Sequence, residues 1–181
     1  MTSGSWSDTT KWDLHRIPNS ADSVFIDSLT NCNVDIAAEC GSLRSIGRLS
    51  ISNKLKIWGS DTSEIGFIDD IRALLSNAGP GTLRIDTLGQ VSDTLETVGG
   101  GGIIVGGSGN LVNNKGIISI APGGWLSLQS SLVNSGNVSL ENGARVNFAG
   151  DVAGSGSFNF APTSTVSYSG GMQRIVVPDR R

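Results

Sequence analysis

The acidic pair Asp69–Asp70, followed by Arg72, is the densest group of residues in this chain that could do chemistry. Hydrolysis of a sugar bond needs two carboxylates facing each other across the substrate, and calcium takes about six to eight oxygen ligands. The repeated C-terminal coils add only Glu141 and Asp151, which fall on different corners. The sequence therefore predicts no catalytic residue and no enzyme. A calcium ion at Asp69 and Asp70 is the alternative to a solvated Asp–Arg pair.

Other catalytic and ligand-binding classes lack their motifs. His15 is the single histidine and there is no C-x-x-C pair, so we predict no metal site. No G-x-S-x-G elbow is present, and the glycine run Gly99–Gly102 lacks the lysine and the following helix of a phosphate loop. There is no basic cluster for nucleic acid and no apolar run of about 18 residues that would span a membrane.

The four tryptophans are the candidate binding or capping residues. Trp125 is expected to face outward, because later repeats place Arg145 and a threonine at its position. Trp125 and Trp58 could therefore bind a sugar ring or a neighbouring protein, or pack against a loop. Trp6 and Trp12, with Pro18 fixing an extended approach to the first strand, are expected to cap the first coil, and a sugar-stacking platform is the alternative.

Cys32 and Cys40 flank a short predicted strand that includes Val34 and Ile36. A disulfide between them would close a small loop and add about 2–3 kcal/mol of stability in the chain-entropy picture. The alternative is two buried free thiols. Because the composition is that of a secreted protein, we predict the disulfide.

A 20-residue repeat organises the C-terminal half of the chain. Three segments align without a gap, each an alternating run, a turn and a second alternating run: Gly116–Leu128, Gly136–Phe148 and Gly156–Tyr168. Such repeats indicate a solenoid, in which each unit buries its apolar face by stacking on its neighbours. An antiparallel sandwich would not require so strict a spacing. We therefore predict an all-β fold, a single-stranded, right-handed parallel β-helix of five or six coils with about 20 residues per coil.

Apolar residues at matching positions of the repeat form columns. Because alternate side chains of a strand point to opposite faces, these columns are expected to fill one interior. Five columns can be read from the sequence: Ile118, Val138 and Phe158; Ile120, Leu140 and Phe160; Leu126, Val146 and Val166; Leu128, Phe148 and Tyr168; and Val112, Leu132, Val152 and Met172.

The whole chain is expected to form one structural domain. Residues 1–40 would supply the N-terminal cap and first strands, and residues 41–181 the solenoid coils. Units beginning at Gly47 and Gly81 match the repeat but lie 34 residues apart, so we expect insertions near 59–79 and 94–110. The segment Ile68–Asn77 reads as a short helix or an irregular strand, and the stretch 99–109 as a loop or a tight corner.

The first 45 residues carry a recognisable motif. Trp6 and Trp12 are separated by five residues, and Pro18 and the pattern Asp22-x-Val24-x-Ile26 follow. This opening resembles that of secreted or surface β-solenoid proteins of the adhesin and autotransporter-passenger kind, and it is similar to the start of the G8 domain. The resemblance implies an extracellular scaffold, without implying one substrate.

Composition agrees with an extracellular location. The chain has 25 glycines, 16% charged residues and a net charge of −3, and from Thr97 to Gly170 it has four charged residues. We predict a structural role at the cell surface, as a stalk or adhesin segment or as a fibre subunit that associates with itself end to end through unpaired strands. The alternative is a carbohydrate-binding or carbohydrate-active module.

Overall fold

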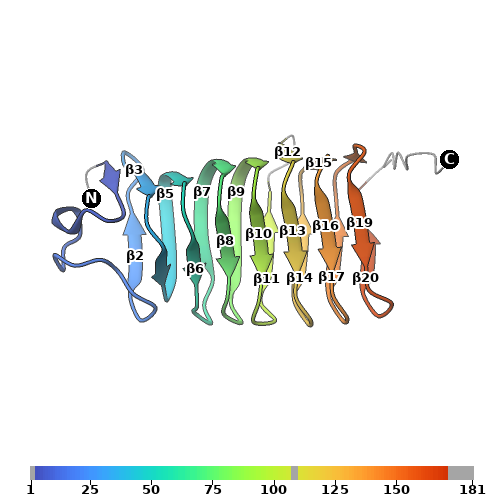
Figure 1. The fold of residues 1–181 in the computed structure, drawn as a ribbon, viewed down its shortest axis with the longest axis horizontal. Coiled ribbons are helices and arrows are strands. Elements are labelled where there is room, and N and C mark those ends of the chain that lie inside the picture. The colour runs from blue at the N-terminus through green and yellow to red at the C-terminus, as the bar shows by residue number, and fades with distance from the viewer. Residues whose placement is uncertain (1–2, 107–109, 171–181) are drawn as a thin grey trace.

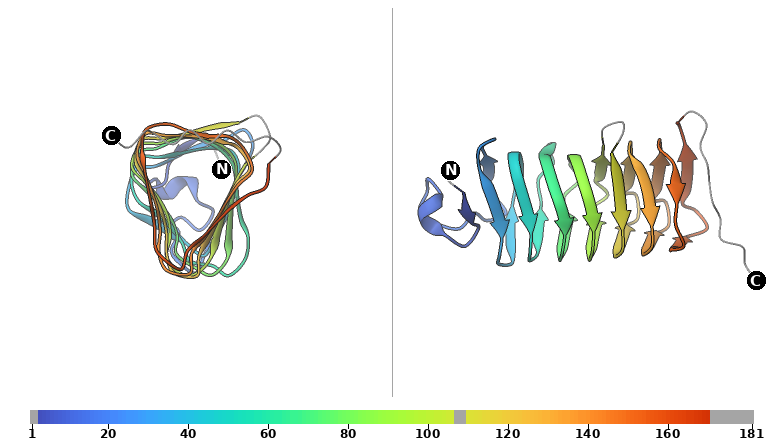
Figure 2. Two further views of the ribbon diagram at one scale, coloured as in Figure 1. Left: turned by 90° about the vertical axis from the view of Figure 1, so that its right-hand side faces the viewer. Right: turned by 90° about the horizontal axis from the view of Figure 1, so that it is seen from above.

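The protein is a parallel β-solenoid of about seven turns with about 20 residues per turn, which confirms the predicted fold class and period. The structure is a computed structural model, and it describes residues 3–106 and 110–170. Figure 1 shows the turns stacked along one axis, with the N-terminal residues beyond the first turn and the last turn at the opposite end. The axial view in Figure 2 shows a three-cornered outline, because each turn contributes strands to three faces.

The first and second faces belong to one sheet, and long strands of the early turns continue around the corner between them. The first face contains β2 (Ser23–Ile26), β5 (Ser42–Ile51), β7 (Ser63–Ile71), β9 (Thr82–Val91), β11 (Gly102–Val105), β14 (Trp125–Leu128), β17 (Arg145–Phe148) and β20 (Thr165–Tyr168). The second face contains β1 (Gly4–Ser5), β3 (Asn31–Val34), the second halves of β5, β7 and β9, then β12 (Leu111–Asn114), β15 (Ser131–Asn134) and β18 (Val152–Ala153).

The third face is a separate sheet with one strand from each turn. Its strands are β4 (Ala38–Cys40), β6 (Leu55–Ile57), β8 (Leu74–Asn77), β10 (Thr94–Thr97), β13 (Ile117–Ile120), β16 (Asn137–Leu140) and β19 (Ser157–Phe160). All strand pairings among the described residues are parallel and mostly in register, so Ile118 lies on Val138, which lies on Phe158. Stacking in this manner satisfies the backbone hydrogen bonds of every inner strand from both sides.

The predicted inward columns form the core. Ile118, Val138, Leu126 and Val146 are all buried, and polar residues such as Ser139 alternate with them on the outside. Because burial in a solenoid comes from the next turn, the core runs as one continuous column along the axis. Met172, assigned to the fifth column, lies outside the described residues.

The insertions predicted near 59–79 and 94–110 are wrong for the described residues of both regions, which form strands of regular turns; residues 107–109 lie outside the described residues. Residues 59–79 contain all of β7 and β8, and Leu75 pairs with Leu55 and with Leu95. Residues 94–110 contain β10 and β11, so the region Gly102–Val105 is a strand that pairs on both sides. These two turns raise the number of turns from the predicted five or six to about seven.

Two buried asparagines form a ladder at one corner of the core. Asn114 Nδ2 donates to Asn134 Oδ1 of the next turn (2.8 Å) and to the carbonyl oxygen of Asn137 (3.1 Å). Asn134 Nδ2 in turn donates to the carbonyl oxygen of Ser157 (3.0 Å). Gly154 occupies the next position with a φ of 114°, where only glycine fits easily. The ladder therefore ties three turns together through the carbonyl oxygens of the first residues of β16 and β19.

Candidate functional site

The two ends of the solenoid differ, and within the described residues no turn covers the last one at the C-terminal end. Phe158, Phe160 and Tyr168 of the last described turn are 37%, 39% and 46% exposed. Their column partners Val138, Leu140 and Phe148 in the turn below are at most 1% exposed. The three aromatic residues occupy core positions but have no described turn above them. We call this surface the open coil end.

The aromatic rings of the open coil end contact one another and the turn below. Tyr168 stacks on Phe148 with ring centroids 5.6 Å apart, and Phe158 lies 5.8 Å from Phe160. In the described part of the chain, β18, β19 and β20 each pair on one side only. A hollow of about 610 Å³ lies beside Phe158 and Phe160 and is also lined by Leu140 and Glu141. Apolar side chains and free strand edges together are the features that accept a further strand or another protein.

The N-terminal end is covered by a folded cap. Trp6 is fully buried and Trp12 is 7% exposed, and their rings meet edge to face at 5.0 Å. Trp12 Nε1 donates to the carbonyl oxygen of Trp6 (2.9 Å), while the Trp6 amide donates to the carbonyl oxygen of Asn33 (2.8 Å). Pro18 is also buried. The structure thus places all three predicted capping residues against the first turn and leaves no described tryptophan face there for a sugar.

Polar contacts hold this cap in place. The Ser7 hydroxyl and amide donate to the two carboxylate oxygens of Asp35 (2.6 and 3.0 Å), and the hydroxyl bond is the main cause of the lowered pKa of Asp35. A short 3-10 helix, η1 (Thr9–Lys11), follows, with the Asp8 side chain accepting from the Thr10 amide. These bonds fix the start of the cap to the first turn.

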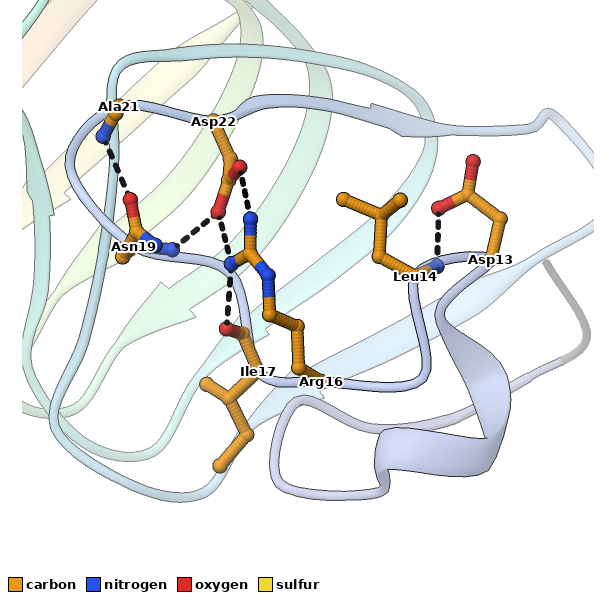
Figure 3. A network of polar contacts seen from close by, with 7 residues as sticks. All are labelled: Asp13, Leu14, Arg16, Ile17, Asn19, Ala21 and Asp22. Carbon is orange, nitrogen blue, oxygen red and sulfur yellow. Dashed lines mark hydrogen bonds and ion pairs between the residues drawn. The ribbon is translucent and has the colours of Figure 1, made fainter.

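A second network closes the cap loop, as Figure 3 shows. Arg16 makes a two-pronged ion pair with Asp22 (2.6 and 2.7 Å), and the Asn19 amide donates to the same carboxylate (2.8 Å). The guanidinium is the main cause of the lowered pKa of Asp22. His15 between these elements has a φ of 51°, an uncommon conformation for a residue with a side chain. The ion pair thus closes the loop, and the Asp22 carbonyl oxygen, which accepts from the Gly41 amide (2.9 Å), joins its end to the next turn.

A cleft of about 460 Å³ separates this loop from strand β2. Its walls are Lys11–Arg16 on the loop side and Ser23–Phe25 on the strand side. Leu14 and Phe25 at the cleft are 62% and 55% exposed, and Ile17 nearby is 38% exposed. No sequence motif marks these residues as a site. The sequence does contain one signal. Leu14 and Ile17 are apolar residues that follow the charged residues Asp13 and Arg16, and a cap that only buries its apolar side chains would not need them there.

Trp58 and Trp125 lie three turns apart and do not form one site. Trp58 is 42% exposed, its Nε1 donates to Glu39 Oε2 (2.9 Å), and Lys56 Nζ lies 5.4 Å from the ring centroid. Trp125 is half-buried on the outer side of β14, where its ring covers Gly102 of the preceding turn. Trp58 therefore presents the more accessible indole, whereas Trp125 packs against its own scaffold.

The acidic pair is engaged in ion pairs. Asp69 pairs with Arg48, and Asp70 Oδ2 lies 3.2 Å from Arg72 Nε. A hollow of about 270 Å³ beside them is also lined by Asn33 and two serines. Within residues 3–106 and 110–170, no group of three or more His, Cys, Asp or Glu side chains is arranged to hold a metal ion. Asp69 is thus half exposed in its ion pair, whereas the Asp70 side chain is 16% exposed and its Oδ1 is buried without a hydrogen-bond partner among the described residues.

The cysteines correct the disulfide prediction. Cys32 and Cys40 are both buried free thiols, pointing into the core from β3 on the second face and β4 on the third. Burial raises the pKa of each thiol to about 12. Spacing in sequence did not reveal that a corner of the solenoid separates their strands. The thiols act as small apolar core residues.

No helix among the described residues has the length and apolar character to cross a membrane. Comparison with known proteins finds no matching family model, no matching curated protein and no matching solved structure. The resemblance of the N-terminal motif to surface solenoids therefore stays a prediction, and the geometry of the two ends carries the functional argument.

Proposed function

We propose that the protein is an extracellular structural β-solenoid without enzymatic activity. In this proposal it acts as a stalk or adhesin segment, or as a subunit of a surface fibre, and associates through its coil ends. The observation that carries the proposal is the contrast between Phe148, 1% exposed, and Tyr168 in the same column, 46% exposed. An exposed core position adjoining free strand edges is a place where a further coil or another molecule adds.

The composition of the last described turn favours association through its sheet edges over shielding of those edges by charged residues. Isolated sheet edges are usually shielded by charged residues, and lysine is the most common of them. From Val152 to Gly170 the sequence has no charged residue, and the exposed side chains are aromatic, hydroxyl or amide groups and Pro162. The low charge of the repeated turns also fits a secreted surface better than a nucleic-acid-binding one.

Concentration-dependent assembly tests the proposal. The protein would be followed by light scattering after size-exclusion chromatography and by negative-stain electron microscopy over a 100-fold concentration range. We expect rods longer than one solenoid, and we expect them to disappear in a Phe158→Ser/Tyr168→Ser variant. The matched control is Ile46→Ser/Leu111→Ser, which removes equally exposed apolar side chains from the sides of the solenoid. Single short particles at every concentration would refute end association.

Carbohydrate binding is the second candidate, and the fixed orientation of Trp58 favours it. An exposed indole held by a hydrogen bond to Glu39 offers a flat apolar face at little entropic cost. A glycan array followed by calorimetry would test this, with Trp58→Ala expected to abolish binding and Trp125→Phe expected to leave it unchanged. If no glycan binds, or if Trp58→Ala binds normally, this candidate fails.

A further inference from the structure

The first strand of the first face has an unpaired edge. β2 pairs with β5 on one side, and no described strand pairs with it on the other. The carbonyl oxygen of Asp22, just before β2, accepts from the amides of Gly41 and Ser42 (2.9 and 3.3 Å). The main chain of Asp22 therefore faces β5, and this fixes the direction of the residues that follow.

Main-chain hydrogen-bonding groups point to opposite sides at successive residues of a strand. Because Asp22 faces β5, Val24 and Ile26 face it too, whereas the amides and carbonyl oxygens of Ser23 and Phe25 point away from it. Within residues 3–106 and 110–170, no hydrogen bond reaches these four groups. A series of unpaired amides and carbonyl oxygens is a template for another extended chain.

The cleft of about 460 Å³ borders this strand. Residues 23–25 line one side of it, and residues 10–16 of the cap loop line the other. Leu14 and Phe25 are its two large apolar side chains that are more than half exposed. In Figure 3 the Leu14 side chain points from the loop toward the segment that follows Asp22. The unpaired main-chain groups thus lie beside a pocket with apolar walls.

The loop wall of the cleft is held in place by the cap. The Asp22 carboxylate accepts two bonds from the Arg16 guanidinium and one from the Asn19 amide, and Trp12 Nε1 donates to the carbonyl oxygen of Trp6. Both walls of the cleft are therefore formed before a ligand arrives. A preformed site loses less binding free energy to ordering than a flexible one.

An extended peptide segment is the occupant that these features fit. Donors and acceptors that recur every second residue are matched by another extended main chain, whereas a glycan or a lipid offers no such series. The cleft volume lies in the range of pockets that hold one small ligand, about 300–1,000 Å³, so a single strand fits. A coil of about 20 residues from a second copy exceeds that space, and the cap loop lies beyond the first turn in its way (Figure 1).

We infer that the unpaired edge of β2 binds an extended segment of a partner protein, which hydrogen-bonds to the main chain of Ser23 and Phe25 and places an apolar side chain between Phe25 and Leu14. Strand addition of this kind takes its affinity from main-chain hydrogen bonds and its specificity from the neighbouring pocket. The inference goes beyond the proposed function, because it needs no self-association and concerns the capped end of the solenoid.

A synthetic peptide tests whether the cleft accepts a strand. The probe is an acetylated and amidated pentapeptide with one phenylalanine between two pairs of threonines, so its single apolar residue sets the register. Binding is followed by NMR titration of the labelled protein. Two N-methylated versions block the amides on one side of the peptide or on the other. We expect one version to bind more weakly, by about fivefold for each hydrogen bond lost, and the other to retain its affinity. No binding of the probe at millimolar concentration, or equal affinities of the two versions, overturns the inference.

Variants of the protein test the two parts of the site. Ser23→Pro removes an amide on the unpaired side, where an edge strand tolerates proline, and Ser23→Ala keeps that amide. We expect Ser23→Pro to bind the peptide at least about fivefold more weakly than Ser23→Ala. Leu14→Ser should also weaken binding, whereas Ile46→Ser, which removes an exposed apolar side chain outside the cleft, should not. Thermal unfolding establishes that all four variants are folded, and equal affinities within either pair overturn the inference.

Hydrogen exchange in the unmodified protein tests the edge itself. Without peptide, the amides of Ser23 and Phe25 should exchange rapidly and those of Val24 and Ile26 slowly, and the peptide should slow the first pair. Slow exchange of Ser23 and Phe25 in the free protein would show that the edge is already covered, which overturns the inference. If the peptide fails to bind while rods form at high concentration, the inference fails and the proposed end association stands.

Discussion

The indole ring of Trp125 occupies the place where a side chain at residue 102 of the preceding turn would lie. Trp125 pairs with Gly102 in the strand register, and a Cβ added at Gly102 would collide with Cε2 and Cζ2 of the indole. The glycine is therefore required by a neighbouring ring one turn away, and its own φ lies in the ordinary range. An aromatic ring that covers a glycine in an adjacent strand stabilises both strands.

This relationship predicts a specific coupling between the two positions. Gly102→Ala should lower the free energy of unfolding by about 1–3 kcal/mol, because the methyl group forces the indole from its place. In a Trp125→Ala background the same substitution should cost much less, since the obstacle is gone. Urea unfolding of the single and double variants measures the coupling. Equal costs in both backgrounds would show that the ring does not decide the residue at 102.

The buried asparagine ladder gives a second prediction. Asn134→Leu should lower the free energy of unfolding by about 1–3 kcal/mol, because the carbonyl oxygen of Ser157 and the amide of Asn114 each lose a buried partner. Asn147→Leu, at an outer position of the next turn, should change stability by less than about 0.5 kcal/mol. Chemical denaturation of both variants is the measurement. Equal effects at the inner and outer positions would contradict a structural ladder.

The buried thiols predict how stability depends on pH in the alkaline range. Burial raises the pKa of Cys32 and of Cys40 from about 9.0 to about 12. Between these values the unfolded chain loses thiol protons that the folded chain keeps, so the free energy of unfolding falls as the pH rises. The limiting slope is about 1.4 kcal/mol per pH unit for each thiol.

Denaturation midpoints at pH 8 and pH 10.5 test this slope, with Cys32→Ala/Cys40→Ala as the matched control. The control should lose less stability across the interval, because it lacks the two groups. A thiol reagent at pH 8 should label both cysteines in denaturant and neither under native conditions. Rapid native labelling, or a disulfide found by mass spectrometry, would contradict buried free thiols.

The cap predicts different tolerance at its two tryptophans. Trp12→Phe removes the donor that reaches the carbonyl oxygen of Trp6, so it should cost about 1 kcal/mol beyond the loss of apolar area. In Trp6→Phe the phenyl ring still fills part of the core. No hydrogen bond is lost there, because the described residues show no acceptor for the Trp6 indole N–H. In thermal unfolding, the midpoint temperature of Trp12→Phe should therefore lie below that of Trp6→Phe. The reverse order would show that the hydrogen bond is unimportant.

The repeated half of the chain could be interpreted from sequence because its spacing is regular. Parallel stacking in register places residues 20 positions apart directly above one another, as with Leu126 and Val146. Any interruption of apolar matching at that period would have left an unfilled core. Fold class, period and inward columns therefore follow from local chemistry repeated along the chain.

The turns predicted as insertions, which contain β7–β8 and β10–β11, could not be recognised from sequence because their columns mix residue types. Asn77 and Thr97 occupy inward positions that hold Ile120 and Leu140 in later turns. They are tolerated in the core because Asn77 donates to two carbonyl oxygens at 2.9 Å and Thr97 accepts from the Ala121 amide. Long strands β7 and β9 also pass a corner within one continuous strand, and the single glycine in each, Gly66 and Gly89, is too weak a signal to mark it. Such partners exist only once the turns are stacked.

The sequence by itself determined which side chains point inward, because alternation along a strand is a local property. Only the tertiary structure decided which of them are covered. Phe148 and Tyr168 share a column and a strand environment, yet one is buried and the other is nearly half exposed. Cys32 and Cys40 likewise both point inward, but a corner places them on different faces. In a solenoid each residue is buried by the turn above or below it, and no short stretch of sequence contains that neighbour.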